Sequence, residues 1–529
     1  MNRLPELESS PGENTEPPRR LSLLRVFIAV AAVCALTAGG TAGFQWWSSS
    51  TAAHASEPWF AGYADVTATP TFAFEAPATP AGRDVVLSFI VSSKDDACTP
   101  SWGTAFTLDE ASVGLDLDRK IARLEQQGGA IAVSFGGQLN DELATGCTDD
   151  GRLLAAYSDV IDRYDVATID LDIEGANLND RAAGVRRAKA IQKLQSDRRA
   201  AGKPLAVWLT LPVAPTGLTE AGQVAVADLL TAGVDLAGVN AMVMNYGAAT
   251  KPDHGLLKAT TEALTSTQRQ LGVLYDRAGT TLSDETLWSK VGATPMIGQN
   301  DVPAEVFGLD AATALNAFAR DHGLGRVSMW SLNRDITCGP NYVDLTRVSD
   351  ACSGVNQGER RFASLLAADL HGRMAPAAAK VTSAETVAPR EIVDDPATSP
   401  YPVWAAESSY LEGTKVVWHR NVYVAKWWTR GDLPDNPVLN AWETPWSLIG
   451  PVLPGERPIK VPTLPPGTYP EWTGTAVYEK GVRVLQDGIP FEAKWWNQAE
   501  SPEAASANPD SSPWAPLTAD QIRQVDNDG

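Results

Sequence analysis

The chain has 529 residues, enough for two to four domains, and 44% of them are hydrophobic, so most of it can bury a core. Its 43 Lys and Arg against 64 Asp and Glu residues give a net charge of −21, which argues against a nucleic-acid surface because phosphate binding needs clustered basic side chains. Only five histidines occur, none paired at helical ligand spacing, and the GxxxxGK[ST] and GxGxxG motifs are absent. We therefore expect no metal site and no cofactor.

An uncharged apolar run covers residues 26–44 and is long enough to span a bilayer. Arg19, Arg20 and Arg25 lie on its N-terminal side, which predicts that residues 1–25 stay cytoplasmic and that the rest is exported. The run is either a long signal peptide, with an Ala-His-Ala cleavage motif at 53–55, or an uncleaved anchor. We expect an extracellular protein, secreted or anchored, that meets a membrane only through this segment.

Four cysteines follow the apolar run, as suits a chain in an oxidising compartment. Pairing Cys338 with Cys352 would close a short loop and is the first pairing to expect, which leaves Cys98 for Cys147. Free buried thiols are the alternative.

Short apolar runs alternate with helix-like stretches from residue 58 to residue 371. This alternation predicts parallel strands joined by helices, and eight such units over roughly 300 residues fit one (β/α)₈ TIM barrel. The connection 67–83 is rich in Pro, Ala and Thr and is predicted to be a loop. The eight runs are 58–66, 84–91, 129–135, 166–174, 205–213, 236–246, 291–298 and 325–333.

The last part of the chain contains an internal repeat. Eleven residues of the segment 401–451, mostly Trp, Tyr, Gly and Pro, recur 68 positions later in the segment 470–518. Each copy has about 50 residues with strand-like pieces, so we predict two small all-β modules. Because neighbours in a strand point to opposite faces, one ring of each Trp-Trp pair can enter the core while the other faces solvent. The alternative is that all these rings are core, but a module this small cannot bury so many large rings, so we expect at least one exposed ring per module. The tryptophans shared by the copies are Trp404, Trp427, Trp428 and Trp446 in the first, and Trp472, Trp495, Trp496 and Trp514 in the second.

Composition and pattern together give the domain organisation. Residues between the barrel and the repeat are rich in Ala, Pro, Thr and Ser, as in a flexible linker. The predicted parts are 1–25 cytoplasmic or signal n-region, 26–44 signal peptide or anchor, 45–57 tether, 58–371 barrel, 372–400 linker, 401–451 first module, 452–469 Pro-rich linker, 470–518 second module and 519–529 tail.

The fourth apolar run carries three carboxylates, Asp170, Asp172 and Glu174, in the sequence IDLDIEG. Strand periodicity places all three on one face, and that face is the barrel interior if Leu171 and Ile173 point outward. Glu174 ends the run at the carboxyl-end mouth, where barrel active sites lie. Crowding of like charges raises the pKa of at least one carboxyl, which supplies the protonated acid that acetal cleavage needs. A structural or calcium-binding column is the alternative, and three interior acids without a basic partner are too costly for plain structure.

This run resembles the DxxDxDxE signature of glycoside hydrolase family 18. The third run ends in Ser134-Phe135-Gly136-Gly137, similar to the family's SxGG, and Trp330 in the eighth matches the Trp under the reacting sugar. The sixth run, VNAMVMNYG, resembles the M-x-Y-D element, with Met242 in the Met place.

The resemblance departs from the family pattern at three positions. Ala167 replaces the first Asp of the signature, Met244 stands in the Tyr place and Asn245 in the Asp place. Tyr246 follows directly, and an offset would let it serve as the family Tyr. The effect of these departures is open at this point.

The family's mechanism, carried over by this resemblance, is hydrolysis assisted by the substrate. Glu174 donates a proton to the glycosidic oxygen, and the substrate's own 2-acetamido oxygen is the nucleophile. Asp172 orients that group and shares a proton with Asp170, while Asn245 or Tyr246 positions it and Trp330 stacks under the sugar. The matched substrate-binding positions are Ser134, Gly136, Gly137, Met242, Met244, Asn245, Tyr246 and Trp330.

The repeat carries a second resemblance. Its AKWWT and AKWWN sequences, with W-x₅-Y-x₂-G upstream, are similar to the chitin-binding modules of carbohydrate-binding module families 5 and 12. The two resemblances imply an exported, monomeric chitinase that binds chitin or a related N-acetylglucosamine polysaccharide. The alternatives are a lectin-like chitin-binding protein with an inactive barrel and an endo-β-N-acetylglucosaminidase acting on N-glycans.

Overall fold

The computed structural model describes residues 57–247, 255–374, 393–457, 463–502, 512–518 and 521–522. The chain divides into residues 1–54 and 55–529, and every described residue belongs to the second unit. The predicted membrane or signal segment, 26–44, lies outside the described residues. Within them, no helix combines the length and the apolar character needed to cross a bilayer.

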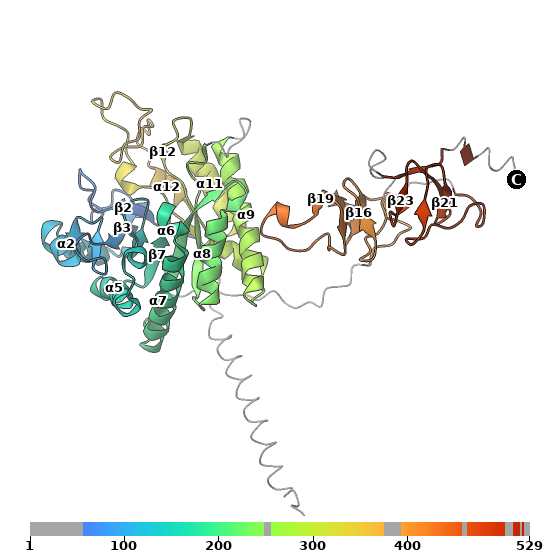
Figure 1. Ribbon diagram of the computed structural model, residues 1–529. Helices are drawn as coiled ribbons and strands as arrows, with labels where there is room; N and C mark the ends of the chain where they lie inside the picture. The colour runs from blue at the N-terminus through green and yellow to red at the C-terminus, as the bar shows by residue number, and fades with distance from the viewer. Residues whose placement is uncertain are drawn as a thin grey trace, which may run out of the picture. The chain divides into compact units, whose positions relative to one another are not determined.

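The eight apolar runs form a closed barrel of parallel strands (Figure 1). The first run is split in two: β1 pairs with the last strand, β14, and β2 pairs with β3, which closes the barrel. Each remaining strand pairs in parallel with its neighbour. The strands are β1 (Trp59–Phe60), β2 (Gly62–Asp65), β3 (Asp84–Ser92), β6 (Ala130–Gly136), β7 (Thr168–Asp172), β8 (Ala206–Ala214), β10 (Leu236–Met242), β11 (Val291–Thr294) and β14 (Arg326–Val327).

Helices cover the outside of the barrel, and α7, α8 and α9 pack side by side (Figure 1). Asp149, Asp180 and Thr219 cap α5, α7 and α8, each accepting a hydrogen bond from a backbone N–H of the first turn. The connection after β2 contains only the short 3₁₀ turn Pro80–Gly82, in line with the predicted loop. The helices are α2 (Leu108–Gly114), α3 (Leu117–Gln126), α4 (Leu143–Gly146), α5 (Asp150–Arg163), α6 (Gly175–Asn179), α7 (Arg181–Ala200), α8 (Glu220–Thr231), α9 (Leu256–Arg277), α10 (Asp284–Ser289), α11 (Leu309–His322) and α12 (Phe362–Leu366), with short strands β4 (Pro100–Trp102), β5 (Phe106–Thr107), β9 (Gly217–Leu218), β12 (Gly298–Gln299) and β13 (Val306–Phe307) in the loops.

Side-chain alternation along the strands separates two layers of the barrel. Outward residues such as Ile169 and Leu171 join the large core between strands and helices. Inward residues of β1 and β8 include Trp59 and Trp208, whose rings meet edge to face at 5.8 Å. These two rings fill the barrel interior together with small side chains such as Ala61.

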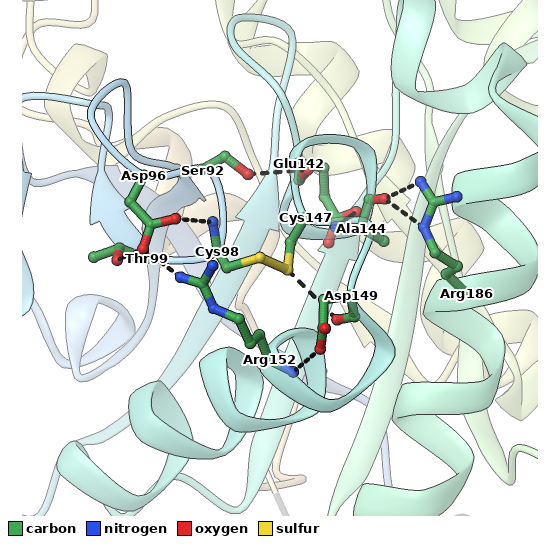
Figure 2. The surroundings of a disulfide bond; sticks show 10 residues. All are labelled: Ser92, Asp96, Cys98, Thr99, Glu142, Ala144, Cys147, Asp149, Arg152 and Arg186. Atoms are coloured by element: carbon green, nitrogen blue, oxygen red, sulfur yellow. Dashed lines mark hydrogen bonds and ion pairs between the residues drawn. A yellow bond between two sulfur atoms is a disulfide. The ribbon is translucent and has the colours of Figure 1, made fainter.

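Two disulfides connect the predicted pairs, Cys98 with Cys147 and Cys338 with Cys352, so the expected pairing is confirmed. Figure 2 shows the first, which ties the segment after β3 to the end of α4. Asp96 supports it by accepting hydrogen bonds from the Cys98 backbone N–H and from Arg152. Each disulfide therefore braces a loop that follows a barrel strand.

The two repeat copies have matching small antiparallel sheets. In each, a three-stranded sheet is built on a hairpin whose two turn residues both have positive φ: His419-Arg420 in the first copy and Asp487-Gly488 in the second. The first copy contains β15 (Ser409–Tyr410), β16 (Lys415–Trp418), β17 (Asn421–Ala425), β18 (Thr429–Arg430) and β19 (Trp446–Pro451), and the second β20 (Val477–Tyr478), β21 (Arg483–Gln486), β22 (Ile489–Ala493), β23 (Asn497–Gln498) and β24 (Trp514–Pro516).

The expectation of at least one exposed ring in each module is confirmed, and the structure exposes both rings of each Trp-Trp pair. Trp427 and Trp428 are 44% and 60% exposed, and the second pair is exposed to a similar degree. The physical reason is that β17 ends at Ala425, so the pair lies in a bend where the two-residue alternation of a strand no longer applies. Both rings of each pair therefore face solvent.

Candidate active site

A cavity of about 390 Å³ opens beside the carboxyl ends of the barrel strands. Asp172 and Glu174 line it together with Trp330, so side chains predicted from two separate motifs meet there. The lining is Tyr63, Asp65, Thr67, Phe89, Val91, Gly103, Gln138, Leu139, Asn140, Asp172, Glu174, Thr210, Met242, Met244, Asn245, Thr294, Met296, Asp301, Trp330, Val348 and Asp350.

Asp170 lies at the floor of the site and is fully buried. One carboxylate oxygen accepts hydrogen bonds from Tyr63 Oη at 2.8 Å and Ser134 Oγ at 2.7 Å. The other accepts from Thr210 Oγ1 at 2.7 Å and from Arg326 Nη1 at 2.6 Å. Four donors from four strands therefore hold this carboxylate in place.

Arg326 corrects the expectation that the three acids lack a basic partner. Its guanidinium, on β14, forms a buried ion pair with Asp170. The column thus contains one cation at its inner end, and the cost of burying the carboxylate is partly offset there.

Asp172 and Glu174 stand in a different environment. Oδ1 of Asp172 is buried without a hydrogen-bond partner among the described residues. Burial, and then the negative charges of Glu174 and Asp170, raise the pKa of Asp172 well above its ordinary value. Burial raises the pKa of Glu174 to about 7. Both side chains therefore retain a proton at a pH where an ordinary carboxyl is ionised.

The end of the strand aims Glu174 at the cavity. β7 ends at Asp172, two residues earlier than the apolar run suggested, but Ile173 N–H still donates to the Thr210 carbonyl of β8 at 3.1 Å. Glu174 keeps an extended backbone, with φ −129° and ψ 165°, and is the residue before α6. The two-residue alternation therefore continues to Glu174.

The SxGG residues support the column from β6 and lie outside the cavity lining. Ser134 bonds Asp170, and Gly137 N–H donates to the Asp172 carbonyl at 2.8 Å. Gly136 has φ +106°, and a Cβ there would lie 2.1 Å from the Asp172 carbonyl oxygen. The glycines are needed because the β6 and β7 backbones approach so closely.

The sixth strand brings Met242, Met244 and Asn245 to the cavity wall. Asn245 Nδ2 donates to Asp301 Oδ2 at 2.9 Å, so a carboxylate stands beside the position where the family has its Asp. Tyr246 turns the other way: its side chain is buried in the core and its N–H donates to Glu305 Oε2. The structure therefore does not place Tyr246 where it would touch a ligand in this cavity, which corrects its expected role.

Three aromatic rings form the apolar side of the cavity. Trp330 and Phe89 stack at 5.5 Å with an interplanar angle of 20°, and Tyr63 lies 6.1 Å from Trp330. Two other aromatic residues near strand ends, Trp102 and Trp208, are buried in the two cores.

Sequence reasoning missed Arg326 and Asp301. Arg326 did carry a signal, because it shares the two-residue period of Trp330 in GRVSMWS and so had to point inward with it. Asp301 carried none, since its contact with Asn245 joins positions 56 residues apart.

No group of three or more His, Cys, Asp and Glu in the part of the chain that the structure describes is arranged to hold a metal ion. Within the column, both oxygens of Asp170 already accept from two donors each.

Both repeat copies present aromatic rings to solvent. Lys426 Nζ lies 4.8 Å above the Trp427 ring, and Lys494 Nζ lies 4.5 Å above Trp495. Trp442, whose counterpart in the second copy is Asp510, is 62% exposed and adds a further ring in the first copy. By contrast, Trp404, Trp446 and Trp514 are buried in the module cores and Trp472 is partly buried against one.

Comparison with known proteins agrees with this site. No family model matches the chain. It is 37% identical over 263 residues, 48% of its length, to a probable bifunctional chitinase/lysozyme of Escherichia coli (strain K12), and 36% identical over 258 residues, 47% of its length, to endochitinase 11 of Metarhizium anisopliae. The alignments span 28% and 47% of those two relatives.

Among solved structures, active domain 2 of the thermostable chitinase from Pyrococcus furiosus, in complex with chito-oligosaccharides, matches with 27% identity and a TM-score of 0.51. The match covers 60% of this chain and 95% of that one. These similarities show that the barrel resembles the catalytic barrels of chitinases.

Proposed function

We propose that the protein is an exported chitinase that hydrolyses β-1,4-linked N-acetylglucosamine polymers. The single observation that carries this proposal is the placement of Glu174 and Asp172 together in a cavity whose other side is formed by Trp330, where burial raises the pKa of Glu174 to about 7. The similarity to chitinases supports the substrate class. The two disulfides support export, because disulfides persist in oxidising compartments.

In the first step, Glu174 gives its proton to the glycosidic oxygen as the bond from that oxygen to C1 breaks. The substrate's 2-acetamido oxygen attacks C1 from the other face, which gives an oxazolinium ion and frees the leaving sugar. Asp172, still protonated and beside Glu174, orients the acetamido group through its unpartnered Oδ1. A carboxyl with a pKa of about 7 suits this step because it holds its proton at neutral pH yet releases it readily.

In the second step, the Glu174 carboxylate takes a proton from water, and the resulting hydroxide equivalent attacks C1. The oxazolinium ring opens, the acetamido group is restored and Glu174 is protonated again. Two displacements at C1 give net retention, the exception among glycosidases in which the substrate supplies the nucleophile. Only sugars that carry an N-acetyl group can react in this way.

We further propose that the two repeat copies are chitin-binding modules. Trp427, Trp428, Trp495 and Trp496 expose flat rings that can stack on pyranose faces, and Trp442 adds a fifth. Two modules on one chain would keep the barrel at an insoluble substrate through a raised effective concentration.

The test is release of N-acetylglucosamine oligomers from colloidal chitin by the full chain, beside Glu174→Gln. We expect product with the parent, a loss of at least about 10³-fold with the variant, and equal sedimentation of both with chitin. Matched sedimentation with no product from either protein would favour a lectin-like protein. Release of glycans from a glycoprotein, with none from chitin, would favour an endo-β-N-acetylglucosaminidase.

A further inference from the structure

Arg326 occupies an unusual position in the barrel. Its side chain is 1% exposed, and its guanidinium carbon lies 5.4 Å from the ring centroids of Trp59 and Tyr63 and 5.6 Å from that of Trp208. Three rings thus surround a buried cation inside the barrel, and such contacts gain strength when the cation is desolvated.

The cation touches the carboxylate column directly. Nη1 donates to Asp170 Oδ1 at 2.6 Å, and Nη2 donates to Tyr63 Oη at 3.1 Å. Tyr63 in turn donates to Asp170 Oδ2, so Arg326 contacts the carboxylate directly and is also connected to it through the tyrosine. Burial alone would lower the pKa of Arg326, but Tyr63 and Asp170 raise it above its ordinary value, and the guanidinium stays charged.

A structural role alone explains this arrangement poorly. Replacing a buried ion pair by apolar groups of similar volume is often neutral or stabilising, and the rings of Trp59 and Trp208 already pack beside this one. The Arg326–Asp170 ion pair lies at the inner end of the carboxylate column. The outer members of that column, Asp172 and Glu174, line the cavity, so the ion pair is next to the groups proposed to act on the substrate.

We propose that Arg326 is a positioning residue for the hydrolysis proposed above: through its direct contact and through Tyr63 it holds the Asp170 side chain immobile at the inner end of the column, so that Asp172 is the carboxyl left free to contact the substrate. The proposal rests on the proposed function and adds a residue to it. Asp170 has all its acceptor capacity committed, whereas Asp172 Oδ1 has no partner in the described part of the chain.

The charges around the pair fix the sign of the expected effect. The ionisable groups are Tyr63 from β2, Asp170, Asp172 and Glu174 from β7 and its end, and Arg326 from β14. The neutral polar groups are Ser134, Thr210 and Asn240, from β6, β8 and β10. Arg326 is the one cation in this described set, and it lowers the pKa of Asp172 against burial and two like charges. Without Arg326, we expect the carboxyls of the column to bind an additional proton at a higher pH than they do in the parent protein.

The experiment compares the pH dependence of kcat/KM on a soluble N-acetylglucosamine tetramer for the full chain, Arg326→Met and Arg326→Lys. In Arg326→Met we expect the acid limb of the profile, where kcat/KM falls as the pH is lowered, to move to higher pH by about one unit or more. The reason is that a neutral side chain of similar length removes the cation. Arg326→Lys keeps a charge and should keep the limb near that of the parent while losing rate, since it cannot reach both Asp170 and Tyr63. An acid limb unchanged in folded Arg326→Met would overturn the proposal.

A second pair of variants covers the case in which Arg326→Met does not fold. Asp170→Asn and Asp170→Asn/Arg326→Met differ only in the cation, and the double variant leaves no unpaired buried charge. If Arg326 acts by holding Asp170, the two should have kcat/KM values within about twofold of each other at their own pH optima, because the group that the arginine holds is already replaced. A further loss of more than about tenfold on removal of the arginine would overturn the proposal. An inactive parent chain overturns the proposed function and this inference together, whereas an active parent with unshifted variants overturns only the inference.

Discussion

The barrel cavity and the repeat copies use the same aromatic chemistry in opposite surroundings. In the cavity, Trp330 and Phe89 are partly buried and stack on each other beside two carboxyls of raised pKa. In the repeat copies, Trp427 and Trp428 stand in solvent beside a lysine, on a module with no such carboxyl pair among its described residues. The difference indicates that bond cleavage needs burial, which holds a proton on an acid, while binding to a surface needs only exposed rings.

The largest effect that separates the two regions is expected from the exposed rings. If the repeat copies are the chitin-binding modules proposed above, replacing Trp427, Trp428, Trp495 and Trp496 by Ala should weaken binding to insoluble chitin by about 100-fold, because two linked modules reinforce each other's binding. Hydrolysis of a soluble tetramer should stay within about twofold of the parent. Sedimentation with chitin and a tetramer assay on the same preparation measure both. A variant that loses soluble activity as well would show that the two regions are not separable.

The pH dependence tests the burial of Glu174. Since its pKa is raised to about 7 and the acid must be protonated, kcat/KM on the tetramer should fall about tenfold per pH unit above that value. A basic limb below pH 6 would contradict the role given to burial.

The same shift predicts a change in stability. A carboxyl whose pKa is higher in the folded than in the unfolded state stabilises the fold fully at pH values below its ordinary, unfolded-state pKa. This contribution to the free energy of unfolding is lost as the pH rises through about 7, the pKa of Glu174 in the folded state. Urea unfolding at pH 5 and pH 8 should show a smaller pH-dependent loss in Glu174→Gln than in the parent. Equal losses in both proteins would assign the pH dependence to other groups.

A single hydrogen bond joins Asn245 to Asp301 in the cavity wall. A carboxylate only accepts, so the Asn245 amide must turn its Nδ2 to Asp301 and keep its oxygen available as an acceptor. Asp301→Ala should raise KM for the tetramer by up to about tenfold, the worth of one hydrogen bond. The exchange Asn245→Asp with Asp301→Asn should restore KM, whereas Asn245→Asp alone places two carboxylates together and should not. Equal KM values in all four proteins would remove the pair from substrate binding.

The Cys338–Cys352 disulfide is expected to affect stability and to have no effect on binding to insoluble chitin. It closes a loop that carries Val348 and Asp350 to the cavity wall. Replacing both cysteines by Ala should lower the free energy of unfolding by about 2–4 kcal/mol and the Tm with it, and leave binding to insoluble chitin unchanged. Loss of chitin binding with unchanged Tm would contradict this division of roles.

The barrel and the outer part of the site follow from local sequence patterns. Eight apolar runs fixed the strand order in advance because parallel strands need intervening helices, and the alternation in IDLDIEG placed Asp170, Asp172 and Glu174 on the inner face. The repeat was readable because each turn and each core Trp recurs at one spacing.

The parts that sequence reasoning missed depend on contacts between distant segments or on where an element ends. Arg326 meets Asp170 across 156 positions, so the ion pair was invisible along the chain even though the inward direction of Arg326 was not. Exposure of both rings of the Trp427-Trp428 pair, rather than of one, was not predictable because β17 ends two residues before the pair, and strand ends are set by pairing with β19 rather than by local composition.

The most direct test of the central claim is ¹H NMR of the tetramer during the first minutes of hydrolysis by the full chain, beside Glu174→Gln. The account predicts that the parent releases product in the β-anomeric form before mutarotation, and that the variant releases none. Product in the α form would contradict the substrate-assisted route, and equal release by the variant would remove Glu174 from its place as the acid.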